Sequence, residues 1–387
     1  MALTAPYVPS IKVSPQNFGT HYELAWEYRV RPQDICLGGN GRIYLAAKIT
    51  DPKTDLPTYE MVSFNRDGKD QHTWALPDGV RMPDLFRNEH GDVWMLATTE
   101  SANTEMEVLL PVSATESIKG RRRFAASQEQ ILRVRDGVIT RFCADSYREK
   151  DARIVADPLD AKGKRRDWKL PKKPYPAVAA INGDTIHTLS WLEEDGQCVH
   201  SIYDNDGKAR AAFEISLAEV DGDGGVQPIA MHNDGGGIFL TSHHGAIGIA
   251  NAAPGKPCQW RAILPLPGKN LAAYSIFAVK QNRDGISLAH FTYGPQIEFD
   301  ENGVGHTPDD GVSGNGWLAW RGDTLLDAWV NDPASKDYLD TKGNRHHLEK
   351  ENMVLSDQDV SDDGRIGNVF YAMPDDSKVV HVTLHRF

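Results

Sequence analysis

Residues Arg87 to Glu100 read RNEHGDVWMLATTE, a polar turn that closes on Gly91 and leads directly into a strand-like run. The same phrase recurs along the chain as LGGNG-RIYLAA, AAING-DTIHTLSW, MHNDGGG-IFLTS, VKQNRDG-ISLAHF and VSDDG-RIGNVFYA, with turns at or near Gly41, Gly183, Gly236, Gly285 and Gly364. Tight hairpin turns need positive φ, which Asn, Asp and Gly tolerate best. Each occurrence therefore predicts a β-hairpin.

A second set of tight turns follows these hairpins: SFNRDGK, RVRDGV, YDNDGK, ANAAPGK and WRGDT. Each unit then reads as four strands, in which tight turns join the first strand to the second and the third to the fourth. Apolar runs such as IYLAAKI, ILRVR and AAFEISL are typical of strands buried between stacked sheets. Repeated four-stranded antiparallel units of about forty to fifty residues indicate a β-propeller.

Six such units can be traced, and we expect one all-β domain over residues 1–387. The last unit, from Asn352 to Phe387, supplies three strands, whereas the run HYELAWEYRV (residues 21–30) is a lone strand before the first unit. Pairing of this N-terminal strand with the C-terminal blade predicts a closed six-bladed propeller without exposed edges. The alternative is seven blades, with a further unit in the interval between Gly91 and Gly183.

The turn phrases resemble those of bacterial propeller repeats of the two-component-regulator and NHL types. In those repeats a D-x-x-G turn likewise precedes an aromatic-rich strand, which here is VWMLA. The resemblance covers the repeat units and implies the fold alone, so it carries no catalytic residue across.

Four long segments interrupt the units, at residues 100–128, 147–174, 292–315 and 331–352. Each is expected either to join the second strand of a unit to the third or to connect two units. In a meander both kinds of connection lie on the face opposite the tight turns. Loops longer than about twelve residues are usually functional or disordered, so this long-loop face is where we expect the function.

Composition limits the partners and the compartment. The formal net charge of −12 argues against general nucleic-acid binding, which needs a basic face. No apolar run is long enough for a membrane span. The four cysteines lie far apart without a CxxC pair, and we expect buried thiols of a cytoplasmic protein. Export of a mature form without its signal is an open alternative.

Basic residues gather in two of the long segments. One carries Lys119, Arg121, Arg122 and Arg123, and the next carries Arg165 and Arg166 within KGKRRDWKLPKK. If the two loops are neighbours, they form a basic patch that attracts an anionic ligand. The alternative is a pair of solvated charged loops.

Candidate acid–base groups lie in later units. His243 and His244 occupy a corner of the fourth unit, and His347 lies in the connection 331–352. His290, with Tyr293 close behind it, ends a strand of the fifth unit. These groups could act as acid, base or metal ligand. The alternative is that the histidines are unrelated to one another.

Three aspartates share one offset: Asp34, Asp84 and Asp357 each stand seven residues before a turn glycine. Equivalent positions place them near the start of the innermost strands, at the channel mouth on the long-loop face. A ring of carboxylates could bind calcium or another divalent cation. Alternatively, each carboxylate accepts hydrogen bonds from backbone amides of the neighbouring blade.

These features favour binding of a polar, anionic small molecule or saccharide over the channel, with lyase or hydrolase chemistry by histidine and carboxylate groups. The chain has no GxSxG elbow, no Walker loop and no dinucleotide-binding fingerprint. A second hypothesis is a protein-interaction platform that uses the long-loop face. A concave polar pocket would favour the first hypothesis, and a flat or apolar face the second.

Overall fold

The computed structural model describes most of the chain between residues 6 and 386. The described residues are 6–16, 19–51, 53, 56–76, 80–88, 90–99, 105–110, 119–125, 128–144, 152–158, 164–171, 176–182, 184–192, 197–216, 227–231, 237–243, 246–252, 259–266, 271–282, 285–295, 298–299, 305–306, 314–321, 324–330, 337–339, 345–347, 353–372 and 377–386.

Within these residues the strands form one five-stranded sheet and six four-stranded sheets, all antiparallel. We name each sheet after its innermost strand. The β31 sheet runs β1 (Ser10–Gln16), β2 (Gly19–Ala25), β33 (Val379–Arg386), β32 (Arg365–Ala372), β31 (Met353–Val360). The β3 sheet runs β3 (Arg29–Leu37), β4 (Ile43–Thr50), β5 (Pro57–Phe64), β6 (His72–Ala75). The β7 sheet runs β7 (Val80–Arg87), β8 (Val93–Thr99), β9 (Glu105–Leu110), β10 (Lys119–Ala125).

The remaining sheets follow in chain order. The β11 sheet runs β11 (Gln128–Arg135), β12 (Val138–Ala144), β13 (Arg153–Pro158), β14 (Arg166–Lys169). The β15 sheet runs β15 (Pro176–Asn182), β16 (Thr185–Leu192), β17 (Gln197–Asp204), β18 (Ala209–Ser216). The β19 sheet runs β19 (Gln227–Met231), β20 (Gly237–His243), β21 (Ala246–Ala252), β22 (Gln259–Pro265). The β23 sheet runs β23 (Leu271–Gln281), β24 (Ile286–Pro295), β27 (Gly314–Arg321), β28 (Thr324–Val330).

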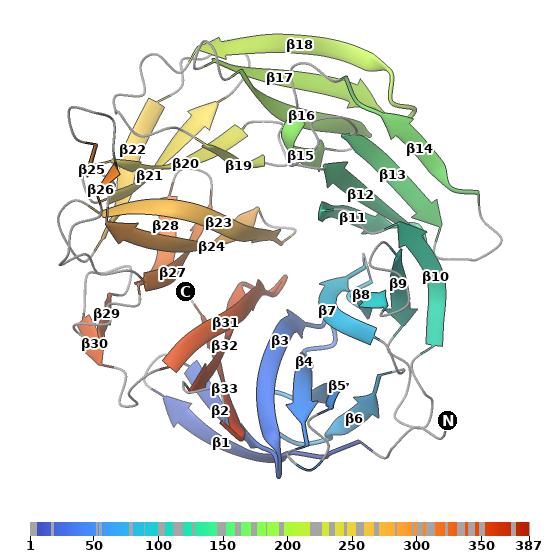
Figure 1. Ribbon diagram of the computed structural model, residues 1–387, viewed down its shortest axis with the longest axis vertical. Helices are drawn as coiled ribbons and strands as arrows, with labels where there is room; N and C mark the ends of the chain where they lie inside the picture. The colour runs from blue at the N-terminus through green and yellow to red at the C-terminus, as the bar shows by residue number, and fades with distance from the viewer. Residues whose placement is uncertain are drawn as a thin grey trace.

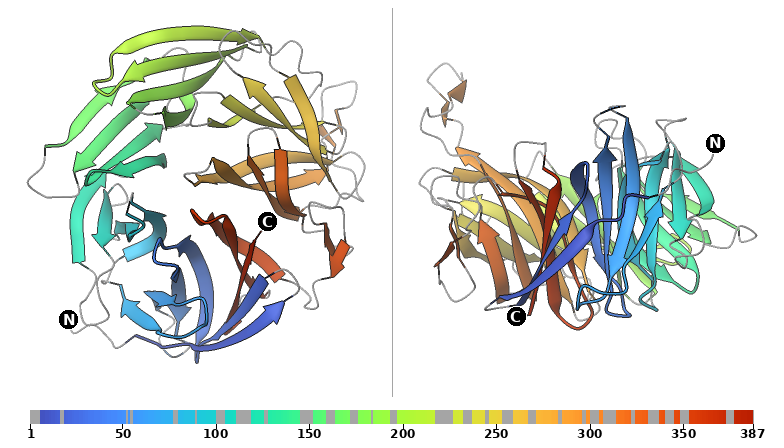
Figure 2. Two further views of the ribbon diagram at one scale, coloured as in Figure 1. Left: turned by 180° about the vertical axis from the view of Figure 1, so that it is seen from behind. Right: turned by 90° about the horizontal axis from the view of Figure 1, so that it is seen from below.

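The sheets surround a central axis, with the first strand of each repeat nearest that axis (Figure 1). This is a β-propeller, as the repeated turns predict. Two small hairpins lie outside the sheets: β25 (Glu298–Phe299) with β26 (Gly305–His306), and β29 (Asp337–Leu339) with β30 (Arg345–His347). The β25–β26 hairpin projects from one face (Figure 2, right). In the described part of the chain no helix is long and apolar enough to cross a membrane.

The prediction of six blades in total, which counts the sheet formed from both ends of the chain, is wrong. Residues 128–169 form the β11 sheet, in the interval between Gly91 and Gly183. Two of the four predicted long segments are also shorter than expected. Residues 100–128 contain β9 and β10, and residues 147–174 contain β13 and β14. By contrast, residues 292–315 hold the β25–β26 hairpin between β24 and β27 of one sheet. Residues 331–352 hold the β29–β30 hairpin between the β23 and β31 sheets.

The first strands of the chain pair with the last one. β2 lies antiparallel to β33, with Gly19 opposite His385 and Ala25 opposite Val379. The imidazoles of His21 and His381 lie 3.1 Å apart (Nε2 to Nδ1) across this seam. β1 adds a fifth strand on the outer side of β2, so both ends of the described chain contribute to one sheet.

The hydrophobic core lies between neighbouring sheets, because strand residues alternate between the two faces of a sheet. On β3, Ile35 and Leu37 pack toward β32 and β33 in one core cluster. Cys36, between them, packs in a second cluster with Leu85 and other residues of the β7 sheet. A third cluster joins the β23 and β31 sheets, and a fourth joins the β11 and β15 sheets. These packed faces hold the innermost strands in fixed positions around the axis.

The N-terminal segment before β1 crosses from the β31 sheet to the β3 sheet. The Tyr7 amide donates a hydrogen bond to Glu60 Oε1 of β5 at 2.7 Å, and Gln71 Nε2 donates to the Pro9 carbonyl at 3.0 Å. Glu60 is 2% exposed, and its Oε2 has no hydrogen-bond partner among the described residues. Burial raises the pKa of Glu60 to about 7, although the Tyr7 amide opposes this rise.

Replacing Glu60 by glutamine is expected to stabilise the protein above pH 7 by about 2 kcal/mol and to change little at pH 4.5. A carboxyl whose pKa is raised by folding binds more protons when folded, so its contribution is favourable at low pH. That contribution is lost between its ordinary pKa of 4.5 and the folded value of about 7. Urea denaturation of the two proteins across this range measures the difference. A Glu60→Gln effect that does not vary with pH would contradict the assignment.

Candidate functional site

The innermost strands share a backbone irregularity that aims their side chains toward the axis. Each one shows a register shift against its neighbouring strand. Such β-bulges bend a strand and re-aim the side chains beside them. Asp34, Asp84 and Asp357 are the first paired residues after the shift in β3, β7 and β31. The common offset from the turn glycine therefore marks equivalent positions in three consecutive sheets.

Two of these aspartates bind backbone amides of the next sheet. The Asp357 carboxylate accepts a hydrogen bond from the Ile35 amide at 3.0 Å, and the Asp34 carboxylate accepts one from the Leu85 amide. Ile35 and Leu85 each directly follow the equivalent aspartate of their own strand. This arrangement is the predicted alternative to a metal ring. One carboxylate links the β31 sheet to the β3 sheet, and another links the β3 sheet to the β7 sheet.

The ammonium group of Lys280, on β23, lies among the aspartates. Its Nζ is 2.7 Å from Asp34 Oδ1 and 2.7 Å from Asp357 Oδ2, and it also donates to the Ile35 carbonyl at 3.4 Å. Asp84 acts on the ammonium electrostatically, and the carboxylates together raise the pKa of Lys280 well above its ordinary value against the effect of burial. We call Lys280, Asp34, Asp84 and Asp357 the axial cluster. It joins four consecutive sheets.

The axial cluster contains more carboxyl groups than one ammonium can neutralise. Burial raises the pKa of Asp34 to about 6, against the opposing effect of Lys280. Burial and then the Asp34 carboxylate hold the pKa of Asp357 well above its usual value. Burial also raises the pKa of Asp84, which hydrogen-bonds with Asp34. Because interacting carboxyls titrate together, we expect the cluster to hold a proton near neutral pH.

The members of the axial cluster differ in their access to solvent. The Asp34 side chain is 7% exposed, whereas the side chains of Asp357 and Lys280 are 17% and 23% exposed. Asp84 is exposed, yet burial is the largest cause of its raised pKa. Asp84 is therefore the exposed member of the cluster, with part of its side chain packed against protein. Asp84 is thus the carboxyl of the cluster best placed to meet a ligand.

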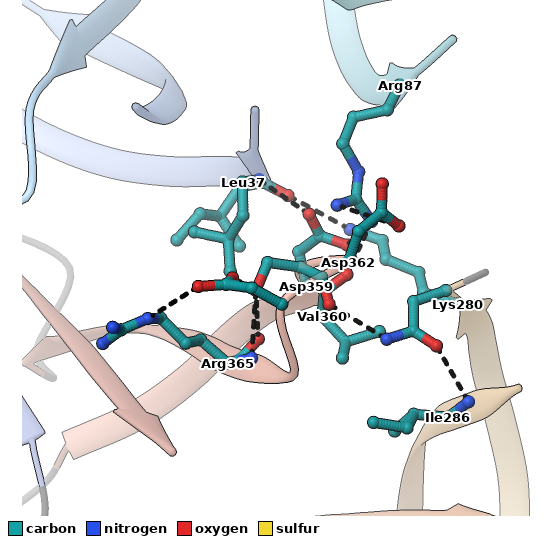
Figure 3. A network of polar contacts seen from close by, with 12 residues as sticks. Leu37, Arg87, Lys280, Ile286, Asp359, Val360, Asp362 and Arg365 are labelled. Atoms are coloured by element: carbon teal, nitrogen blue, oxygen red, sulfur yellow. Dashed lines mark hydrogen bonds and ion pairs between the residues drawn. The ribbon is translucent and has the colours of Figure 1, made fainter. Parts of the chain in front are cut away.

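A second layer of charged groups lies next to the axial cluster. The Asp359 carboxylate accepts a hydrogen bond from the Leu37 amide at 2.7 Å. Arg87 donates to the Val360 carbonyl at 2.5 Å and lies 3.7 Å from Asp359 and 3.9 Å from Asp362. Figure 3 shows these residues close to Lys280 at the end of β31. The innermost strands are therefore linked by charged side chains at two successive levels.

The aspartates lie near the middle of the innermost strands and the second level lies nearer the tight turns, whereas the prediction placed the aspartates at the start of these strands on the long-loop face. Asp84 and Asp357 stand in the second halves of β7 and β31, and Lys280 is the last residue but one of β23. Just beyond Lys280, Asn282 Nδ2 donates to the Ser361 carbonyl at 2.9 Å, between two turns. The prediction failed because the innermost strands begin several residues before the aspartates.

The structure supplies a cation to the aspartates from the chain itself. Among the described residues, no group of three or more His, Cys, Asp or Glu side chains is arranged to hold a metal ion. The Lys280 ammonium occupies the place where carboxylates from two sheets converge. We therefore interpret Asp34, Asp84 and Asp357 as partners of Lys280, and the calcium site as a hypothesis that gains no support from their geometry.

The predicted histidine and tyrosine groups are not brought together in the described part of the chain. His244 lies outside the described residues, and the side chains of His243, on β20, and His347, on β30, do as well. Tyr293 is 1% exposed and packs beside Phe291 in the core. His290 lies in the middle of β24; burial lowers its pKa, and Asp357 partly opposes this. His290 thus lies within electrostatic reach of Asp357 in the axial cluster.

The predicted basic residues lie on outer strands. Arg121, Arg122 and Arg123 are in β10 and Arg166 is in β14, the outermost strands of two neighbouring sheets (Figure 1). The side chains of the first three lie outside the described part. Arg165 pairs with Asp167 at 2.9 Å, and Arg166 lies 3.6 Å from Asp206. The two described arginines therefore already have acidic partners.

The structure describes the side chains of two of the four cysteines, which were predicted to be buried thiols. Cys36 and Cys143 are buried free cysteines. Cys258 lies outside the described residues, as does the side chain of Cys198.

Comparison with known proteins does not assign this chain to a family. No protein-family model matches the chain, and none of the curated proteins matches it. Solved structures with a similar arrangement include Sqt1 from Chaetomium thermophilum, with 13% identity and a TM-score of 0.44 over 92% of this chain and 96% of that one. Sqt1 bound to the N-terminus of the ribosomal protein L10 matches with 14% identity and a TM-score of 0.42 over the same shares.

Prolyl oligopeptidase B from Galerina marginata matches with 10% identity and a TM-score of 0.43, over 75% of this chain and 47% of that one. The match thus covers about half the length of the prolyl oligopeptidase.

Proposed function

We propose that this propeller is a binding protein for a ligand with a cationic group, which enters along the central axis and meets Asp84. The observation that carries the proposal is the excess of carboxyl over ammonium groups in the axial cluster, of which Asp84 is the exposed residue. An incoming ammonium or guanidinium group would take the place of the proton that the carboxyls share. Opposite charge nearby favours the ionised carboxylate, so binding would release a proton.

The charge of the whole chain supports the same class of ligand. The net charge of −12 attracts cations over long distances and raises their rate of association. Arg165 and Arg166 already have aspartate partners, so we rank a cationic ligand above the anionic one. A basic segment of a protein partner and a small polyamine present the same chemistry. Asp34 and Asp357 hold neighbouring sheets together, which favours a binding role for the cluster over lyase or hydrolase chemistry.

Spermidine is expected to raise the melting temperature of the wild-type protein, and citrate at equal ionic strength is not. A ligand that binds only the native state stabilises it. Asp84→Asn should abolish this shift, since it removes the exposed carboxyl. It leaves in place the hydrogen bonds that Asp34 and Asp357 accept from backbone amides. Differential scanning fluorimetry and calorimetric titration measure the two effects.

Asp206→Asn is the matched control, because it removes one negative charge from an exposed side chain on another sheet. It should keep the spermidine response. If citrate stabilises the protein and spermidine does not, the anionic-ligand hypothesis is the better one. If Asp84→Asn and Asp206→Asn respond alike, the cation does not bind at the axial cluster.

A further inference from the structure

Two tyrosines meet where the N-terminal segment crosses the β3 sheet. Tyr7 precedes β1, and Tyr28 lies between β2 and β3. Their ring centroids are 4.6 Å apart at an interplanar angle of 68°. Both rings are half-buried and pack on the core cluster between the β31 and β3 sheets. The rings therefore rest on a fixed base and keep part of their surface in solvent.

Acidic side chains from three segments act electrostatically on the two rings. Glu27 directly precedes Tyr28 in the connection before β3, and Asp51 directly follows β4. The carboxylate of Glu27 is the largest cause of the raised pKa of Tyr28. Burial, and then Tyr28, Asp51, Glu60 and Glu27, raise the pKa of Tyr7. The phenol rings thus lie in a negative local field.

Glu60 is buried on β5 and lies against the backbone of Tyr7. Its Oε1 accepts the Tyr7 amide at 2.7 Å, so the carboxyl is placed at the backbone of Tyr7 itself. Its Oε2 is buried without a hydrogen-bond partner among the described residues. A buried carboxylate normally has a partner. Glu60 thus adds a buried acidic group with one unpaired oxygen next to Tyr7.

Two exposed apolar residues adjoin this group, one along the chain and one at the end of the β4–β5 pair, where Thr50 lies opposite Pro57. Val8, next to Tyr7, is 67% exposed, and Leu56, which directly precedes β5, is 69% exposed. Exposed apolar side chains beside aromatic rings and carboxylates suit a cation that carries alkyl groups. Aromatic side chains bind such cations through cation–π contacts, in the manner of sites for quaternary ammonium ligands and methylated lysine.

We propose that Tyr7, Tyr28, Glu27 and Asp51, with Glu60 against the backbone of Tyr7, form a binding site for an alkylated ammonium group. Tyr28 stands six residues before Asp34 along β3, which corresponds to roughly 20 Å of extended strand. The site is therefore separate from the axial cluster, and it does not depend on the function proposed for that cluster.

Choline and its neutral isostere 3,3-dimethylbutanol test the site by titration calorimetry or by NMR of the tyrosine rings. Wild-type protein is expected to bind choline, and the isostere at least tenfold more weakly, because a cation–π contact needs the charge. Tyr28→Phe should keep choline binding, and Tyr28→Leu should weaken it at least tenfold. Asp84→Asn should bind choline like the wild type, which separates this site from the axial cluster.

The source of the group is tested with two basic peptides of one sequence, one with lysine and one with trimethyllysine. Tighter binding of the trimethylated peptide than of choline would identify a protein partner, and equal binding would identify a small amine. The proposal is overturned if the neutral isostere binds as well as choline. It is also overturned if Tyr28→Leu, folded by circular dichroism, binds choline like the wild type.

Discussion

Replacing Lys280 by methionine is expected to lower the free energy of unfolding by about 3 kcal/mol at pH 7.5, since it leaves largely buried carboxylates without their cation. The Lys280 ammonium holds Asp34 and Asp357 at 2.7 Å each and so links the β23 sheet to the β31 and β3 sheets. At pH 5 the loss should be at least halved, because carboxyls with raised pKa values then take up protons instead. Urea denaturation at the two pH values measures the difference.

Lys12→Met serves as the control for loss of a lysine. Lys12 also pairs with a carboxylate, Glu23, at 3.2 Å, but its side chain is 77% exposed. Exposed ion pairs contribute about 0.2–1 kcal/mol, so this variant should lie close to the wild type at both pH values. A Lys280→Met loss that is equally small, or equally large at pH 5 and pH 7.5, would show that the ammonium does not balance the aspartates.

Replacing Gly91 by alanine is expected to cost about 3 kcal/mol of stability. Gly91 has φ +83°, and an added Cβ would lie 2.5 Å from the Gly39 Cα in the turn of the neighbouring sheet. The Gly39 amide also donates a hydrogen bond to the Gly91 carbonyl at 2.8 Å. The new methyl group would therefore push two turns apart, in addition to the strain of positive φ.

Gly137→Ala separates the two causes. Gly137 has φ +68°, but a Cβ there would meet nothing within 4 Å. We expect a loss of about 1 kcal/mol from backbone strain alone. The difference between the two variants in denaturant unfolding then measures the turn-to-turn contact. Equal losses would mean that this contact does not hold the β3 and β7 sheets together.

The sequence predicted that the three aspartates occupy equivalent positions, because the tight turns fix the register of the innermost strands, but it placed them too near the start of these strands. Counting seven residues back from Gly41, Gly91 and Gly364 reaches equivalent bulges in three sheets. Lys280 was missed, although it stands five residues before Gly285, as Asp359 does before Gly364. A search at that second offset would have found both residues. It could not have shown which group of another sheet each one meets.

The six-blade prediction did not include the β11 sheet, because charged residues concealed its strands. The turn at Asp136 and Gly137 joins β11 to β12, the first two strands of a sheet, whereas the repeat pattern predicted it between the last two strands of a unit. β10 and β14 are outermost strands, rich in arginine and lysine, so their patterns resemble those of solvated loops. Outer strands need little apolar surface, and basic residues on them discourage pairing with other chains.

The pairing of β2 with β33 has a consequence for the order in which the protein is assembled during synthesis. His21 and His381, which meet across this seam, are 360 residues apart in the chain. One edge of the β1–β2 hairpin therefore stays unpaired during synthesis until β33 has been made. Contacts this distant form slowly, and an open strand edge invites pairing with other nascent chains. We therefore expect this hairpin to be the segment that most needs a chaperone to protect it from aggregation during synthesis.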